Sequence, residues 1–253
     1  MAIKKVEAVV IKRYPVRETS LIVTFFSKQN GKIRGLVKGA RQEKNPLSAR
    51  FEPFTRLSVV YYEKTKSDTH LISETSVLES NSFLRDRLDH FAYGSYMVEL
   101  IDAFFDLYDP YPEVYDLLRA SFRALTSALP TQVARIFEVK LFELLGILPA
   151  LSQCAMCGRQ NLDLAYFSPA QGGIICPRCD RYEADTVRVS KGTLQSIAYF
   201  LNHPVKTAIK LRLGPQIEKE LERIQVKFLQ YRLEYPLKTP NFLHEIESLT
   251  QKS

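Results

Sequence analysis

The fold of this chain depends on two short runs, Cys154-Ala155-Met156-Cys157 and Cys176-Pro177-Arg178-Cys179. They hold all four cysteines of the protein, and eighteen residues separate the second cysteine from the third. Two cysteines three positions apart can turn both sulfur atoms toward one ion, and two such turns supply four thiolates in a tetrahedron. The spacing is typical of a zinc site. We therefore predict that these four cysteines bind one Zn²⁺.

Four sulfur ligands close the coordination sphere of zinc and leave no position for a reacting water, so the predicted ion is structural. Iron in a rubredoxin-like site uses the same ligands and remains an alternative. Free buried cysteines would not be expected in two matched pairs, and disulfides need an oxidising compartment. The predicted role of the metal is to fix a loop at residues 150–182.

The net positive charge of the chain comes entirely from its first third. Residues 1–80 hold 15 Lys and Arg against 8 Asp and Glu, whereas residues 81–253 hold 20 of each kind. A basic excess confined to one region favours a polyanionic partner. The sequence has no apolar run of membrane-spanning length and no signal-peptide pattern at its start. With clustered cysteines as well, we expect a cytoplasmic protein that does not enter a membrane.

The first 80 residues are predicted to form five short strands. The strands are expected at residues 6–13, 21–26, 32–38, 57–62 and 70–75. Asn30-Gly31 between the second and third is a strong hairpin signal. Five strands in this length fit an OB-fold barrel, and an SH3-like barrel fits the pattern almost as well. We therefore predict a barrel domain at residues 1–80.

A basic run crosses the third strand of this domain and the segment that follows it. Between residues 28 and 50 the chain has seven Lys or Arg and one acidic residue, Glu43. Cations that neutralise phosphates beside rings that stack on bases are typical of single-strand binding. Many of the nearby rings (Phe25, Phe26, Phe51, Phe54, Tyr61 and Tyr62) should instead fill the barrel core. The basic residues of this run are predicted to contact phosphates, and they are Lys28, Lys32, Arg34, Lys38, Arg41, Lys44 and Arg50.

From residue 81 onward the apolar residues recur at spacings of three and four, which predicts helices. The expected helices are at about 82–105, 114–129, 131–145, 191–201 and 215–234, with a short one near 242–249. Within the cysteine loop, residues 164–167 and 173–175 are predicted to pair as a β-ribbon. The fold class is therefore α+β and multidomain, with a helical domain at residues 81–253 that carries the inserted four-cysteine loop.

Several stretches spread along the chain resemble the RecO family of bacterial recombination mediators. The first hairpin, residues 18–32, is similar to that of the family, as is the run Lys38-Gly39-Ala40-Arg41. Residues 144–149, which lead into Cys154, resemble the family's approach to its metal loop. Residues 167–169 and 172–176 resemble the second half of that loop, so the likeness covers nearly the whole chain.

The resemblance implies a non-enzymatic DNA repair protein that binds single- and double-stranded DNA and anneals complementary strands. It implies action with RecR and with the single-strand binding protein, whose acidic tail would contact the helical domain. Together they help RecA replace the single-strand binding protein on gapped DNA, near the bacterial nucleoid. The resemblance implies that the DNA-binding residues are Lys28, Lys32, Arg34, Lys38, Arg41 and Lys44. It likewise implies that the metal ligands are Cys154, Cys157, Cys176 and Cys179.

Two other classes of function compete with this hypothesis. An RNA-handling module with an OB-fold and a zinc loop would use the same stacking and phosphate contacts. A zinc-loop DNA glycosylase would need a proline nucleophile after the initiator methionine, and residue 2 is Ala2. A NAD-dependent ligase would need a Lys-x-Asp-Gly motif, which the sequence lacks. The sequence therefore favours a binding protein over an enzyme.

Overall fold

The structure is a computed structural model that describes residues 2–42, 47–181 and 185–250. By packing, the chain divides into two compact units. The first contains residues 1–122 and 237–253, and the second contains residues 123–236. These units differ from the predicted division after residue 80, which stays a prediction as a domain boundary.

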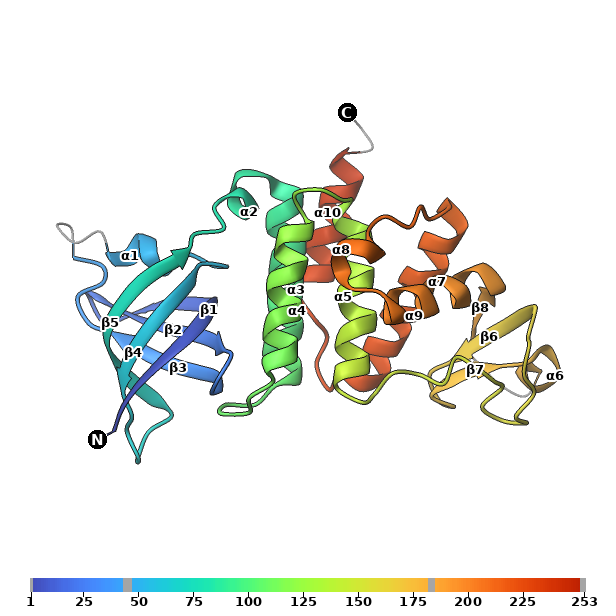
Figure 1. The fold of residues 1–253 in the computed structure, drawn as a ribbon, viewed down its shortest axis with the longest axis horizontal. Helices are drawn as coiled ribbons and strands as arrows, with labels where there is room; N and C mark the ends of the chain where they lie inside the picture. The colour runs from blue at the N-terminus through green and yellow to red at the C-terminus, as the bar shows by residue number, and fades with distance from the viewer. Residues whose placement is uncertain (1, 43–46, 182–184, 251–253) are drawn as a thin grey trace. The chain divides into compact units, whose positions relative to one another are not determined.

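Five strands form a closed barrel at the start of the chain (Figure 1). They are β1 (Ile3–Val16), β2 (Ser20–Ser27), β3 (Gly31–Val37), β4 (Arg56–Tyr62) and β5 (Thr69–Glu79). The order around the barrel is β1-β2-β3-β5-β4, in which only β3 and β5 run parallel. This is the five-stranded barrel predicted from the sequence, with the short helix α1 (Leu47–Arg50) between β3 and β4.

Apolar side chains from the strands fill the interior of the barrel. Phe25, Leu57, Val59 and Tyr61 are fully buried in one apolar cluster, together with Phe51 from the segment after α1. Because Phe51 meets the edge of Phe25 with ring centroids 6.3 Å apart, the α1 segment covers one mouth of the barrel. The predicted hairpin at Asn30-Gly31 is confirmed, and Gly31 has the positive φ of 64° that glycine adopts without strain.

A β-bulge in β1 changes which side chains face the interior. The alternation of the sequence would place Lys12 on the same face as Val10. The pairing with β2 shifts between these two residues, so that Arg13 comes opposite the core residue Val23. One extra residue reverses the inward and outward pattern of a strand. As a result Arg13 faces the mouth of the barrel, and Lys12 reaches Asp102 outside it.

Helices from both ends of the chain complete the first unit. After α2 (Phe83–Asp86) and α3 (Leu88–Phe104) comes α4 (Pro112–Ala124), and α10 (Thr239–Thr250) packs on α3. The predicted helix at 82–105 is thus two helices, because Arg87 has an extended backbone. Phe26 and Phe54 of the barrel pack against Phe105 and Phe122. These aromatic contacts explain why the first helices belong with the barrel by packing.

The second unit combines helices with a small sheet. Its helices are α5 (Pro130–Leu144), α6 (Pro177–Asp180), α7 (Lys191–Asn202), α8 (Val205–Ala208) and α9 (Pro215–Arg232). The sheet has the order β7-β6-β8, formed by Gly173–Ile175, Leu164–Ser168 and Val187–Ser190. The predicted ribbon at residues 164–175 is confirmed, whereas β8 and α8 were not anticipated. In the part of the chain that the structure describes, no helix is long and apolar enough to cross a membrane.

Candidate metal site and nucleic-acid surface

The first cysteine pair lies on a tight turn whose backbone is hydrogen-bonded on both sides. The N–H of Gly158 donates to the carbonyl of Cys154 at 2.9 Å, and the N–H of Cys154 donates to the carbonyl of Arg159 at 2.8 Å. Gly158 has a φ of 71°, a conformation that a side chain at this position would strain. This turn brings Cys154 and Cys157 to the same side of the loop.

The second pair follows directly from the small sheet. Strand β7 ends at Ile175, and Cys176 then precedes the short helix α6, in which Pro177 is the first residue. The N–H of Cys179 donates to the carbonyl of Cys176 at 2.9 Å, which closes a second tight turn. The N–H of Ala155 donates to the carbonyl of Ile174 at 2.8 Å and so holds the two turns together.

The structure brings the four predicted ligands into one cluster. The sulfur atoms of Cys154, Cys157, Cys176 and Cys179 all lie within 4.8 Å of one another. The sulfurs of Cys157 and Cys176 are 3.7 Å apart. A tetrahedral ion with bonds of 2.3 Å to sulfur separates its ligands by about 3.8 Å. The cluster therefore fits a metal ion of zinc's size and ligand preference.

The surroundings of the cluster shift the pKa values of two of its thiols in opposite directions. Burial raises the pKa of Cys154, but N–H groups of Cys157, Cys176 and Met156 outweigh it and lower the pKa to about 6. Desolvation and the neighbouring sulfur atoms raise the pKa of Cys179 to about 12. A thiolate in the cluster thus opposes the ionisation of a neighbouring thiol, because two negative charges repel. A cation in the centre of the cluster would favour the ionisation of all four thiols.

The turn after β3 shows why two of the predicted DNA-binding residues are exposed. Gly39 has a φ of 67°, and Ala40 is fully buried in the barrel core. Because these two residues turn the chain and anchor it, Lys38 and Arg41 on either side are exposed. Among the described residues neither forms an ion pair. The N–H of Arg41 also donates to the carbonyl of Thr19 at 2.9 Å, which ties this turn to the one between β1 and β2.

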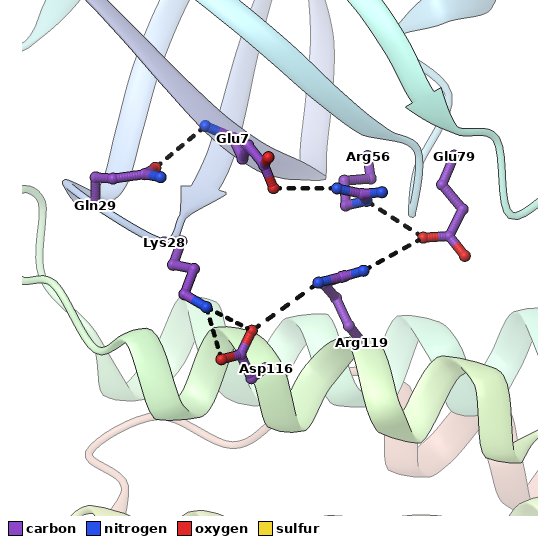
Figure 2. Close-up of polar contacts among 7 residues, drawn as sticks. All are labelled: Glu7, Lys28, Gln29, Arg56, Glu79, Asp116 and Arg119. Atoms are coloured by element: carbon purple, nitrogen blue, oxygen red, sulfur yellow. Dashed lines mark hydrogen bonds and ion pairs between the residues drawn. The ribbon is translucent and has the colours of Figure 1, made fainter.

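Two other predicted residues, Lys28 and Lys32, have carboxylate partners within the first unit. The Nζ of Lys28 lies 2.8 Å from Oδ2 of Asp116 on α4 (Figure 2). The Nζ of Lys32 lies 2.9 Å from Oδ1 of Asp102 on α3, and its side chain is only 12% exposed. Carboxylates of the protein itself therefore balance these two charges, which makes Lys28 and Lys32 less suited to contact phosphates. Their contact with DNA stays a prediction.

The ion pair of Lys28 belongs to a larger set of charged contacts that the sequence did not reveal. Arg56 lies between Glu7 and Glu79, at 3.1 and 3.2 Å (Figure 2). Arg119 of α4 continues from Glu79 toward Asp116. The set links β1, β4 and β5 to α4 within the first unit. Its members are far apart in the chain, so no local pattern indicated it.

The last two predicted DNA-binding residues are Arg34 and Lys44. Arg34 is half-buried on β3, and its Nε is buried without a hydrogen-bond partner in the described part of the chain. Lys44 lies outside the described residues. Of the five predicted DNA-binding positions that the structure describes, Lys38 and Arg41 are exposed and the other three are half-buried.

Most of the aromatic side chains near the basic run are core residues. Phe25, Phe26, Phe51, Phe54 and Tyr61 are fully buried, and of the six only Tyr62 is exposed, at 36%. The sequence reasoning did not single out Tyr14, which is 38% exposed near Arg41. It also passed over Arg17, which is exposed in the turn between β1 and β2. The loop between the first two strands of OB-folds commonly binds oligonucleotides, and this rule could have drawn attention to both residues.

Comparison with known proteins gives the same family for both parts of the chain. A family model described as "Recombination protein O N terminal" matches residues 1–81, and one described as "Recombination protein O C terminal" matches residues 85–240. The chain is similar to "DNA repair protein RecO" of Pelotomaculum thermopropionicum, with 30% identity over 96% of this chain and 94% of that protein. Proteins of the same name match from Symbiobacterium thermophilum (28% identity, 98% of this chain, 99% of the relative) and Salinibacter ruber (29%, 97% and 95%).

Proposed function

The chain belongs to the RecO family of DNA repair proteins, and from this premise we propose that it is a recombination mediator rather than an enzyme. It binds single- and double-stranded DNA and anneals complementary strands. With RecR it helps RecA to load onto DNA that is coated by single-strand binding protein. Its place of action is the nucleoid in the bacterial cytoplasm.

The observation that carries the proposal is the exposed basic turn on the closed barrel. Lys38 and Arg41 project from a turn whose backbone is fixed by Gly39 and by the buried Ala40. Cations held on a rigid element can contact phosphates with little loss of conformational entropy. The basic excess of residues 1–80, with 15 Lys and Arg against 8 Asp and Glu, favours association with a polyanion.

Annealing follows from the same charge. Two DNA strands repel each other through their phosphates, and a cationic surface that neutralises part of that charge lowers the barrier to their meeting. Such a role requires no covalent chemistry. The proposal includes a contact between the acidic tail of the single-strand binding protein and the helical region, and a contact with RecR.

In this proposal the cysteine cluster holds one structural Zn²⁺. Four cysteine sulfur atoms within 4.8 Å of one another support the choice of zinc, because closed four-sulfur sites are typical of structural zinc. When bound, the ion would fix the two turns of the loop relative to the small sheet β6–β7–β8.

The test is a DNA-binding and annealing assay on Lys38→Glu with Arg41→Glu. We expect the double variant to bind single-stranded DNA at least about tenfold more weakly at low salt. The slope of log affinity against log salt should also fall by about one to two, because each lost phosphate contact removes roughly 0.7–0.9 of slope. Annealing of complementary strands coated with single-strand binding protein should slow in parallel.

The matched control is Lys206→Glu with Arg212→Glu, which changes charge by the same amount at exposed positions of the second unit. It should retain DNA binding and its salt slope. Equal losses in both variants would mean that net charge rather than the barrel turn drives binding. Unchanged affinity and slope in the barrel variant would place the DNA elsewhere. A parallel titration with RNA of the same sequence separates a DNA mediator from an RNA-handling module.

A further inference from the structure

The four cysteines of the cluster are not equally buried. Cys154 and Cys176, which come first in their pairs, are 1% and 0% exposed. Cys157 is an exposed residue, and Cys179 is partly exposed. Residues 155–160 are all exposed as well. A small molecule in solution therefore meets Cys157 on the open side of the loop, whereas the two inner cysteines are shielded by the protein.

Hydrogen bonds to the sulfur atoms follow the same division. The N–H of Cys176 donates to Sγ of Cys154 at 3.3 Å, and two N–H groups of the first turn act on the same sulfur. Two N–H groups of the second turn act on the sulfur of Cys176. In the described part of the chain, no backbone N–H donates to the sulfur of Cys157 or Cys179.

This difference affects how readily each sulfur reacts. A hydrogen bond to a thiolate stabilises its negative charge and so lowers its nucleophilicity. The sulfur atoms of Cys154 and Cys176 are therefore both shielded and stabilised. Oxidation of cysteine depends on thiolate character and on exposure. Among the two cysteines without N–H donors, the greater exposure singles out Cys157.

Cys157 also has a second sulfur within reach. Its Sγ lies 3.7 Å from Sγ of Cys176, which belongs to the other turn. The two sulfur atoms are close enough for one to attack the other after a small movement of the loop. A bond between them would join the same two turns that the metal is proposed to join.

We propose that Cys157 is a redox modification site, at which a hydroperoxide oxidises the cluster and Cys176 then closes a disulfide. The inference goes beyond the proposed action on DNA and rests only on the proposed metal site. A disulfide formed in this way is transient, because a thiol reductant reverses it. The cysteine loop would thus hold its metal under reducing conditions and lose it under oxidative stress.

The reaction is a two-electron oxidation in two steps. The thiolate sulfur of Cys157 attacks one oxygen of hydrogen peroxide, an S–O bond forms, the O–O bond breaks, and hydroxide leaves. The thiolate of Cys176 then attacks the sulfur of this sulfenic acid, an S–S bond forms, the S–O bond breaks, and a second hydroxide leaves. Each hydroxide takes a proton from the solvent, so one peroxide is reduced to two waters. Only Cys154 and Cys179 remain as ligands, too few to retain the ion.

The experiment treats the zinc-loaded full chain with about half an equivalent of hydrogen peroxide. Isotope-coded alkylation and mass spectrometry identify which thiols are lost first, and a chromogenic chelator measures the released zinc. We expect Cys157 and Cys176 to be lost together, with about one zinc released for each disulfide. A thiol reductant with added zinc should restore the original state.

Three variants test the assignment. Cys157→His keeps a ligand that zinc accepts but removes the reactive sulfur, so peroxide should release its zinc about tenfold more slowly or less. Cys179→His makes the same exchange and should still be oxidised at Cys157. Met156→Ser removes the other sulfur of the exposed segment, 43% exposed, and should release zinc as the unchanged chain does.

The order of oxidation in the unchanged chain decides the outcome even if a variant fails to fold. Oxidation that begins at Cys154 or Cys179, or that consumes all four thiols at equal rates, would overturn the modification site and leave the metal site standing. Elemental analysis precedes the oxidation, and a chain that cannot be loaded with zinc would overturn the metal site and this inference together. The DNA-binding test of Lys38→Glu with Arg41→Glu is independent of both.

Discussion

At the scale of single residues, Glu220 of the second unit is a buried carboxylate that accepts several hydrogen bonds. Its carboxylate accepts hydrogen bonds from Oγ1 of Thr193 at 2.5 Å, from the N–H and Oγ of Ser190 at 2.8 Å each, and from Nε2 of Gln216 at 2.8 Å. Burial acts to raise the pKa of Glu220, but these donors outweigh it and the pKa is lowered. The ionised form therefore stabilises the junction of β8, α7 and α9.

The pH dependence of this residue follows from the sign of that shift. A carboxylate whose pKa is lowered by folding stabilises the protein above its unfolded pKa, about 4.3, and loses that effect as the pH falls through the folded value. We expect Glu220→Gln to lower the free energy of unfolding by about 1–3 kcal/mol at pH 7. The deficit should shrink steadily below about pH 4. Urea titrations across pH 3–7 measure it.

The exposed Glu234 provides the control, since Glu234→Gln should change stability little at any of these pH values. A Glu220→Gln deficit of constant size from pH 7 down to pH 3 would contradict the assignment of an ionised, hydrogen-bonded carboxylate.

The same scale shows which residues the sequence could identify. Cys154, Cys157 and their partners were predictable because the spacing within each pair already determines a turn. Lys28 and Lys32 could not be judged in this way, because their partners Asp116 and Asp102 lie 88 and 70 residues further along the chain. A lysine that balances a distant carboxylate looks, in the sequence, identical to one that is free to bind phosphate.

At the scale of elements, the cysteine loop is the part whose stability should depend on an ion. We expect Cys154→Ser with Cys157→Ser to reduce bound zinc from about one ion per chain to nearly none, because two ligands are lost. The midpoint of thermal unfolding should fall by roughly 5 °C or more. Elemental analysis and calorimetry measure the two effects, and a colourless purified protein separates zinc from iron.

A suitable control keeps every thiol and changes the two exposed residues between them. Ala155→Ser with Met156→Ser should retain the ion and the melting temperature. Loss of metal without any loss of stability in the cysteine variant would mean that the ion has no structural role.

The sequence patterns predicted some helices and strands correctly and missed others. The barrel strands were found because alternation, an Asn-Gly turn and short length all agree. The bulge after Val10 was not, since an inserted residue looks like ordinary sequence until the pairing with β2 is known. Strand β8 was missed for a similar reason, because four residues directly before a helix give little period to read.

At the scale of the whole molecule, the first unit is built from both ends of the chain. The carboxylate of Glu99 on α3 accepts hydrogen bonds from the N–H groups of Lys238 and Thr239, at 2.8 and 2.9 Å. Leu243 and Ile246 of α10 are buried. The last segment therefore completes the packing of α3.

Removal of residues 237–253 should consequently destabilise the first unit. We expect a loss of about 3 kcal/mol or more, from the apolar surface that two buried aliphatic side chains would expose. Hydrogen exchange should accelerate in α3 and stay unchanged in β6, β7 and β8. A chain shortened only by residues 251–253 serves as the control. Equal acceleration in both units would show that α10 acts on the protein as a whole.

The return of α10 to α3 also sets an order on biosynthesis. The barrel strands and α3 leave the ribosome first, but their last helix emerges only after all of residues 123–236 have been translated. The second unit lies in sequence wholly inside the first, so it has every residue it needs while the first unit still waits for its closing helix. The first unit therefore completes its folding after the second unit has been synthesised, when α10 packs on α3, a helix made 140 residues earlier.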